Sequence, residues 1–146
     1  MYMAIYRERL WASLGIFVAV ALVIPASLLV FLPINVEAGL IIGVVLFLVI
    51  AGLLLGSTAV IEVSESELKA GKALLPREFV GNVTSFREPE ATVQRGTKLD
   101  ARAWLLIRGW IHPVVKIEIT DPSDPTPYWL ISTRRPEELA RALTAK

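Results

Sequence analysis

The chain has 146 residues, 54% of them apolar, and 15 Lys and Arg against 14 Asp and Glu leave a net charge of +1. A balanced charge argues against nucleic-acid binding, which usually requires a basic domain or stripe. The absence of cysteine excludes disulfides and thiolate metal sites, and the single histidine excludes a histidine-rich metal centre. We therefore expect no metal, no other cofactor and no nucleic-acid partner.

Two apolar runs follow a short charged N-terminal segment. They cover residues 10–32 and 39–61, and Glu37 is the only charged residue between positions 10 and 61. Each run would form a helix about 34 Å long, enough to cross the roughly 30 Å hydrocarbon layer of a membrane. A soluble protein with two such buried helices would need more surrounding chain than is present. The runs therefore predict two transmembrane helices.

The short connection between the runs, residues 33–38, predicts an antiparallel hairpin. A cleaved signal peptide is the poorer interpretation of the first run, because the run is too long and a second one follows directly. Arg7 and Arg9 precede the first run and Lys69 and Lys72 follow the second, whereas the connection has no Lys or Arg. Such flanks are typical of the cytoplasmic side, so we expect both termini in the cytoplasm.

Small residues indicate a packing face on the first helix. Gly15 and Ala19 fall on one side of it at helical spacing. Pro25 is expected to bend the helix, because its ring displaces the carbonyl of Ala21.

The second helix carries two glycine pairs at a spacing of four residues. Gly39 and Gly43 form one pair, and Gly52 and Gly56 form the other, on roughly the opposite face. Each pair lets another backbone approach closely, so one can meet the first helix while the other serves self-association or another subunit. The alternative is that glycine is simply common in membrane helices.

The remaining residues, 62–146, predict a separate cytoplasmic domain, with residues 1–61 forming the N-terminal segment and hairpin. Apolar or alternating stretches predict strands, and a polar loop is expected at 87–100; the strands cover residues 58–63, 68–74, 79–86, 103–107, 114–120 and 128–133. Pro136 fits the first position of a terminal helix, and two glutamates follow it. No Gly/Ser-rich spacer precedes the first strand, so we expect the domain close to the membrane.

The order of these elements predicts the fold class. It is a membrane α-helical hairpin plus a small mostly-β domain, of the kind seen in pleckstrin-homology-like split barrels that a C-terminal helix closes. This analogy concerns the fold and carries no function with it.

Two adjacent arginines are the candidate anion or lipid-headgroup site. Arg134 and Arg135 precede the terminal helix, whose first N–H groups are free to bind an anion. Adjacent residues of an extended segment point to opposite faces, however, and the alternative is surface ion pairing with Glu137 and Glu138.

Aromatic residues divide into core and surface candidates. Trp104 and Trp129 lie in apolar strands and are expected in the core. Trp110 lies in a turn, so we expect it to be exposed and a candidate for partner contact.

The other polar segments do not predict chemistry. His112 has no nucleophile or metal-ligand motif around it. The proline-rich segment 121–127 reads as a rigid turn, because a calcium loop normally carries glycine. We therefore expect no catalytic and no metal-binding residues.

Several segments resemble those of a known protein family. They are YRERLW at 6–11, LPREFVG at 75–81, DARAW at 100–104 and DPSDPTPYWLISTRRPEEL at 121–139. Together they resemble a bacterial family of small two-span membrane proteins of unknown function, over nearly the whole chain. The resemblance implies a location in the bacterial inner membrane and brings no catalytic residues with it.

These features favour a non-enzymatic membrane protein whose hairpin tethers a cytoplasmic domain that binds a protein partner or a lipid headgroup. The first alternative is a small accessory subunit, whose hairpin packs into a larger membrane complex. The second is an enzyme acting at the membrane surface.

Overall fold

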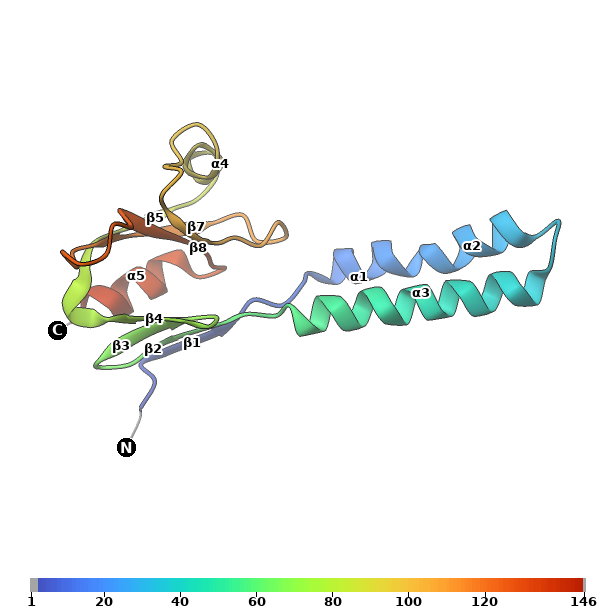
Figure 1. Cartoon of the computed structure of the whole chain (residues 1–146), viewed down its shortest axis with the longest axis horizontal. Helices are drawn as coiled ribbons and strands as arrows, with labels where there is room; N and C mark the ends of the chain where they lie inside the picture. The colour runs from blue at the N-terminus through green and yellow to red at the C-terminus, as the bar shows by residue number, and fades with distance from the viewer. Residues whose placement is uncertain (1–2, 146) are drawn as a thin grey trace. The chain divides into compact units, whose positions relative to one another are not determined.

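The computed structural model describes residues 3–145, which form two compact units (Figure 1). Residues 11–58 form a helical hairpin, and residues 3–10 combine with residues 59–145 in a β domain. The sequence places the domain boundary after residue 61. In the structure the boundary lies after residue 58, and residues 3–10 also belong to the β domain. The reason is strand pairing between residues on either side of the hairpin, described below.

The first apolar run forms two helices, α1 (Leu14–Ala21) and α2 (Val23–Phe31). They meet at Leu22, whose N–H donates to the carbonyl of Ala19 at 3.2 Å in a tightened turn. Pro25 explains the interruption, because it has no N–H for the Ala21 carbonyl and its ring crowds that carbonyl. The predicted bend therefore lies where α1 ends.

The second apolar run forms one helix, α3 (Val36–Gly56). Its start is capped by Asn35, whose side-chain oxygen accepts the N–H groups of Glu37 at 3.0 Å and Ala38 at 3.3 Å. By length and composition, both Leu14–Phe31 and Val36–Gly56 are able to cross a membrane.

The hairpin closes through the first glycine pair of α3. A Cβ on Gly39 would lie 3.0 Å from Cβ of Phe31, and one on Gly43 would lie 3.0 Å from Cα of Ile24. A side chain at either position would require its neighbours to shift, so this pair of glycines lies against the first helix. Around Gly52 and Gly56, by contrast, no described atom beyond the adjacent residues and backbone of α3 itself lies within 4 Å of the ideal Cβ position.

Gly15 and Ala19, expected on a packing face, do not contact α3 closely. Gly15 and Ala19 are exposed, and no described atom lies within 4 Å of a Cβ built on Gly15. The close approach to α3 is made by α2 instead, where Ser27 is buried. The break at Leu22 separates α1 from the turn end of the hairpin, so residues of α2 form the contact.

The β domain contains two four-stranded sheets. Sheet A has the order β1-β2-β3-β4, all antiparallel, from β1 (Tyr6–Arg9), β2 (Val60–Val63), β3 (Glu67–Ala70) and β4 (Ala73–Pro76). Sheet B has the order β5-β7-β8-β6, from β5 (Val80–Phe86), β7 (Val114–Ile119), β8 (Tyr128–Ser132) and β6 (Trp104–Leu106), which is parallel to β8. The sheets do not close into a barrel, so the arrangement is split-barrel-like.

Short helices complete the β domain, namely η1 (Arg77–Phe79), α4 (Glu90–Arg95) and the terminal helix α5 (Pro136–Thr144). The helix α5 lies between the two sheets (Figure 1) and buries Leu139 and Leu143 in the core shared by both. Each fully buried leucine contributes about 1.5–3 kcal/mol to folding. The predicted fold class, an apolar hairpin with a small mostly-β domain ending in a helix, is confirmed.

Three local expectations differ from the structure. The prediction of a single strand at 68–74 is wrong, because this segment forms parts of two strands, β3 and β4. Gly71 adopts a φ of 59° and turns the chain between them. The loop expected at 87–100 contains α4. The strand β1 was not expected, since its charged residues were interpreted only as a membrane flank.

Candidate functional site

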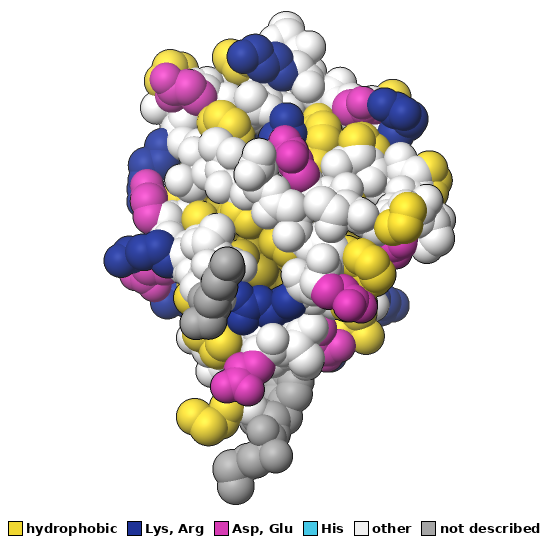
Figure 2. All heavy atoms as spheres, turned by 90° about the vertical axis from the view of Figure 1, so that its left-hand side faces the viewer, with side chains coloured by type: hydrophobic (Ala, Val, Ile, Leu, Met, Phe, Trp, Pro, Cys, Tyr) yellow, Lys and Arg dark blue, Asp and Glu magenta, His cyan; other side chains and the backbone are white. Residues whose placement is uncertain are grey.

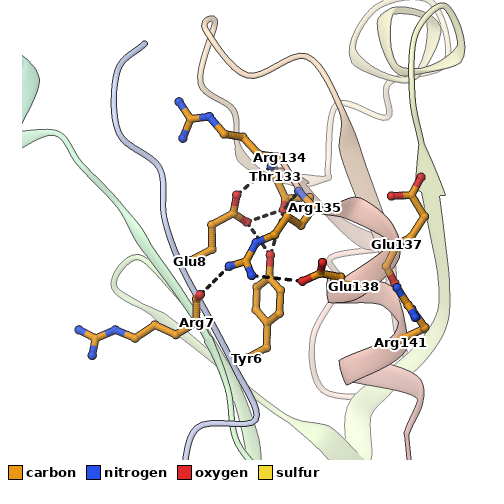
Figure 3. Close-up of polar contacts among 9 residues, drawn as sticks. All are labelled: Tyr6, Arg7, Glu8, Thr133, Arg134, Arg135, Glu137, Glu138 and Arg141. Carbon is orange, nitrogen blue, oxygen red and sulfur yellow. Dashed lines mark hydrogen bonds and ion pairs between the residues drawn. The ribbon is translucent and has the colours of Figure 1, made fainter. Parts of the chain in front are cut away.

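A buried carboxylate lies where the N-terminal strand meets the segment before α5 (Figure 3). Strand β1 alternates buried and exposed side chains, so Tyr6 and Glu8 point inward while Arg7 and Arg9 point outward. The Glu8 side chain is therefore turned into the domain, where the residue is 7% exposed. A charge in that position must be satisfied by hydrogen bonds to be tolerated.

Three donors surround the Glu8 carboxylate. The Tyr6 hydroxyl donates at 2.7 Å, the backbone N–H of Arg134 donates at 2.8 Å, and the Thr133 hydroxyl donates to the same carboxylate. Thr133 is fully buried at 0% exposure, so its hydroxyl has no access to water. The carboxylate thus organises the junction of β1, β8 and α5.

The tyrosine in this cluster keeps its proton. Burial raises the pKa of Tyr6 above its ordinary value; the hydrogen bond to Thr133 opposes this rise and the interactions with Glu8 add to it. A protonated hydroxyl donates to Glu8, whereas a phenolate would repel it. The raised pKa therefore agrees with the hydrogen-bond geometry.

Arg135 is held within the same cluster. Its guanidinium carbon lies 4.8 Å from the centroid of the Tyr6 ring, and its Nη2 donates to the carbonyl of Arg7 at 2.7 Å. Its Nη1 pairs with Glu138 at 3.1 Å. The guanidinium thus connects the β1 backbone with the first turn of α5.

The two arginines proposed as an anion site have different surroundings. Figure 3 shows the Arg134 side chain directed away from Arg135, as expected for neighbours in an extended segment. The alternative of ion pairing holds for Arg135 with Glu138, whereas Glu137 pairs instead with Arg87 at 2.6 Å. The geometry therefore does not bring the two guanidinium groups together around one anion.

Trp110 was expected to be exposed, but the structure places it partly inside the domain. It is half-buried and packs against the main core, and its Nε1 has no hydrogen-bond partner among the described residues. The neighbouring Ile111 is 2% exposed and belongs to the core, so this loop packs against the domain. Trp104 and Trp129 stack with ring centroids 4.4 Å apart, and Trp129 is buried as expected.

The remaining polar candidates form turns. Asp121 accepts the Ser123 N–H at 2.9 Å, and Asp124 accepts the Thr126 N–H at 2.9 Å, which lowers the pKa of Asp124. This is the turn chemistry expected for the proline-rich segment. Among residues 3–145, no group of three or more His, Asp and Glu residues is arranged to hold a metal ion.

Arg77 is a second residue whose role was not expected. Its Nη2 donates to three carbonyl oxygens at the end of α5, those of Ala142 at 3.1 Å, Leu143 at 3.1 Å and Ala145 at 2.6 Å. Its Nη1 reaches the Ser64 carbonyl at 3.2 Å. A cation at the carbonyl end of a helix satisfies groups that have no intrahelical donor.

An open cavity of about 740 Å³ lies beside this arginine. Figure 2 shows hydrophobic side chains gathered in a hollow on this face, with charged side chains around it. Its lining comes from the segment before β1, the β2–β3 turn, η1, β5 and the end of α5, and comprises Ile5, Glu65, Arg77, Glu78, Val80, Gly81, Leu143, Thr144 and Ala145.

Sequence reasoning missed Glu8, Arg77 and the cavity. The signal for Glu8 was the alternation of residues 6–9, which places an acid on the same side as a tyrosine. Arg77 lies in the segment 75–81 that carried the family resemblance, but no local pattern assigns it to a helix end far along the chain.

Comparison with known proteins identifies one related group. Residues 5–143 match the profile of the family described as Protein of unknown function (DUF3093). No curated protein and no solved structure matches the chain. The match covers nearly all of the residues described above, from the segment before β1 to α5. The chain therefore belongs to the DUF3093 family of proteins of unknown function.

Proposed function

We propose that this chain is a non-enzymatic, two-span protein of the bacterial inner membrane whose β domain is a cytoplasmic interaction module. The observation that carries this proposal is the pairing of β1 with β2, from Tyr6 opposite Val63 to Arg9 opposite Val60. One more bond, from the Leu10 N–H to the Ala59 carbonyl at 2.9 Å, extends the pairing toward the helices.

The pairing matters because the two strands continue into the two spans. Residues 10–13 connect β1 to α1, and residues 57–59 connect α3 to β2. A module on two short, paired connections is restricted in its tumbling, whereas a domain on one flexible linker is not. This restriction suits a domain that presents a surface to a partner at a membrane.

Membrane insertion is supported by the surface of the hairpin. Large apolar side chains along it are exposed, among them Leu14 at 80%, Leu29 at 72% and Leu53 at 69%. In water each exposed apolar Å² costs about 25 cal/mol, so such a surface requires lipid or protein around it. The basic flanks favour cytoplasmic termini, and the family resemblance implies the bacterial inner membrane.

A protein partner is favoured over a lipid headgroup. The headgroup hypothesis relied on Arg134 and Arg135 acting together, and Arg135 is already bonded to Arg7 and Glu138. The buried polar groups around Glu8 satisfy one another, which supports a structural role for them and a non-catalytic domain.

The second candidate function is an accessory subunit or self-associating span. It is favoured by the open face at Gly52 and Gly56, where no described atom lies within 4 Å of a Cβ position. A glycine pair of this spacing on an unoccupied face permits close approach of another helix.

Two measurements on the full chain test these proposals. Membranes of expressing cells are first extracted with alkaline carbonate; release of the chain into the soluble fraction would overturn membrane insertion. The chain is then purified in mild detergent with covalent cross-linking. A stoichiometric partner cross-linked to the β domain supports the interaction module, whereas cross-links confined to α3 support the accessory subunit.

A further inference from the structure

A cavity of about 740 Å³ lies in the β domain beside Arg77, outside the buried Glu8 cluster. Its volume falls within the roughly 300–1,000 Å³ of typical binding pockets. Ile5, Val80 and Leu143 supply apolar lining. Figure 2 shows hydrophobic side chains in a hollow on this face of the molecule. An open apolar hollow of this size is suited to large side chains from another molecule.

The cavity lies at one end of sheet A. Its lining includes Glu65 of the β2–β3 turn and Ile5, which directly precedes β1. Because Tyr6 pairs with Val63 and Arg9 with Val60, this is the end opposite to the one at which the strands continue toward the helices. The cavity therefore lies at the end of sheet A marked by Tyr6 and Val63.

Three charged residues line the cavity, namely Glu65, Glu78 and Arg77. Glu65 and Glu78 are exposed, and neither forms an ion pair with any described residue. The guanidinium of Arg77 is directed to the carbonyl oxygens of α5 and Ser64, so its charge offsets the negative end of that helix. Within residues 3–145, the Glu65 and Glu78 carboxylates therefore form no ion pair beside this apolar surface.

We propose that this cavity is the docking site for a segment of a partner protein in which Lys or Arg residues flank large apolar side chains. The apolar side chains occupy the hollow, and the cations meet Glu65 and Glu78 at its mouth. Such rim charges add little affinity but select the partner, because an acidic segment would be repelled. Anionic lipid headgroups would be repelled for the same reason.

The inference rests on the proposed function of the β domain as an interaction module and names its partner class. The probe is a capped peptide of alternating Lys and Leu that carries a benzophenone photo-cross-linker, added to the full chain in a neutral detergent. A peptide with Glu in place of Lys is the matched control. Cross-linked residues are identified by mass spectrometry, which separates binding in the cavity from binding to the helices or the micelle.

The expected result is cross-linking of the Lys–Leu peptide to cavity residues such as Val80 and Leu143, reduced at high salt. E65Q/E78Q should lower this yield about two- to fivefold, because two weak rim ion pairs are lost. The control E37Q/E90Q changes two other exposed acids, neither of which lines the cavity, and should have no effect. Thr144→Trp narrows the cavity without changing its charge and should also lower the yield.

Equal cross-linking of the Lys–Leu and Glu–Leu peptides, or the same yield in E65Q/E78Q as in wild type, would overturn the docking site. If the peptide test fails in this way but a partner protein still cross-links to the β domain, the docking site is wrong and the proposed interaction module still stands. Absence of any partner on the β domain would remove the proposed function itself. Circular dichroism of each variant confirms that it remains folded.

Discussion

The carboxylate of Glu8 accepts the backbone N–H of Arg134 at 2.8 Å, although 126 positions separate the two residues in the chain. One of them precedes the hairpin and the other precedes the last helix. The β domain is therefore built from both sides of the hairpin, and its N-terminal strand is fixed by a buried charge. The stability of the domain should depend on this contact.

Glu8→Ala should destabilise the β domain by about 3 kcal/mol, because it leaves the Tyr6 and Thr133 hydroxyls and one backbone N–H without their acceptor. The measurement is urea unfolding of the full chain in detergent, followed by tryptophan fluorescence. Arg7→Gln on the same strand removes only an exposed ion pair to Glu62 at 3.5 Å and should cost less than about 1 kcal/mol. Equal losses for the two variants would contradict a special role for Glu8.

Alkaline pH should weaken the domain through Tyr6. Burial raises the pKa of this tyrosine above its ordinary value of 10.0, so the unfolded chain loses the proton first as pH rises. The stabilisation of the folded domain by protonated Tyr6 is fully present below about pH 10. It declines as the pH rises above 10 toward the folded-state pKa. The unfolding midpoint of wild type should fall between about pH 9.5 and 11.5 more steeply than that of Tyr6→Phe. Parallel pH profiles for the two proteins would argue against this assignment.

The β domain should fold without the hairpin only when both of its chain segments are present. A chain joining residues 3–10 through a Gly/Ser linker to residues 59–145 keeps β1 and its pairing with β2, so we expect a cooperative thermal transition. Residues 62–145 alone lack β1 and Ile61, which is fully buried at 0% exposure, and should not fold. Circular dichroism compares the two chains. Cooperative unfolding of the shorter chain would mean that β1 is dispensable.

The two glycine pairs of α3 should respond differently to substitution. Ala at Gly39 and Gly43 places Cβ atoms 3.0 Å from Phe31 and Ile24, so the hairpin should lose about 1–3 kcal/mol. At Gly52 and Gly56 a Cβ meets no described atom of the first helix, so Leu there should leave hairpin stability unchanged while reducing association. Thermal unfolding in detergent and cross-linking in membranes measure the two effects. If the Gly52 and Gly56 changes leave association intact, the open face serves no partner.

Membrane topology is testable with single cysteines, since the native chain has none. Asn35→Cys in the connection between the spans should react with an impermeant thiol reagent in intact cells. Ser123→Cys in the β7–β8 connection should react only after the cells are opened. Labelling of Ser123→Cys alone in intact cells would reverse the proposed orientation.

The sequence by itself determined the elements whose signals are local. Two long apolar runs specify helices, because a backbone surrounded by apolar side chains must pair its own polar groups. Pro136 and the glutamates after it specify the start of α5, and Gly39 with Gly43 specifies a surface of close approach. Each of these signals is complete within a few turns of chain.

Only the tertiary structure decided which distant segments meet. Residues 6–9 have a short alternation that fits a strand and a charged flank equally well, and their partner β2 begins beyond the hairpin at Val60. Two other residues also have partners that lie far from them in the chain. Trp110 packs against the core, and Arg77 donates to a carbonyl at the end of α5. Strand pairing and burial depend on contacts between residues far apart in the chain, and local residue patterns carry no information about those partners.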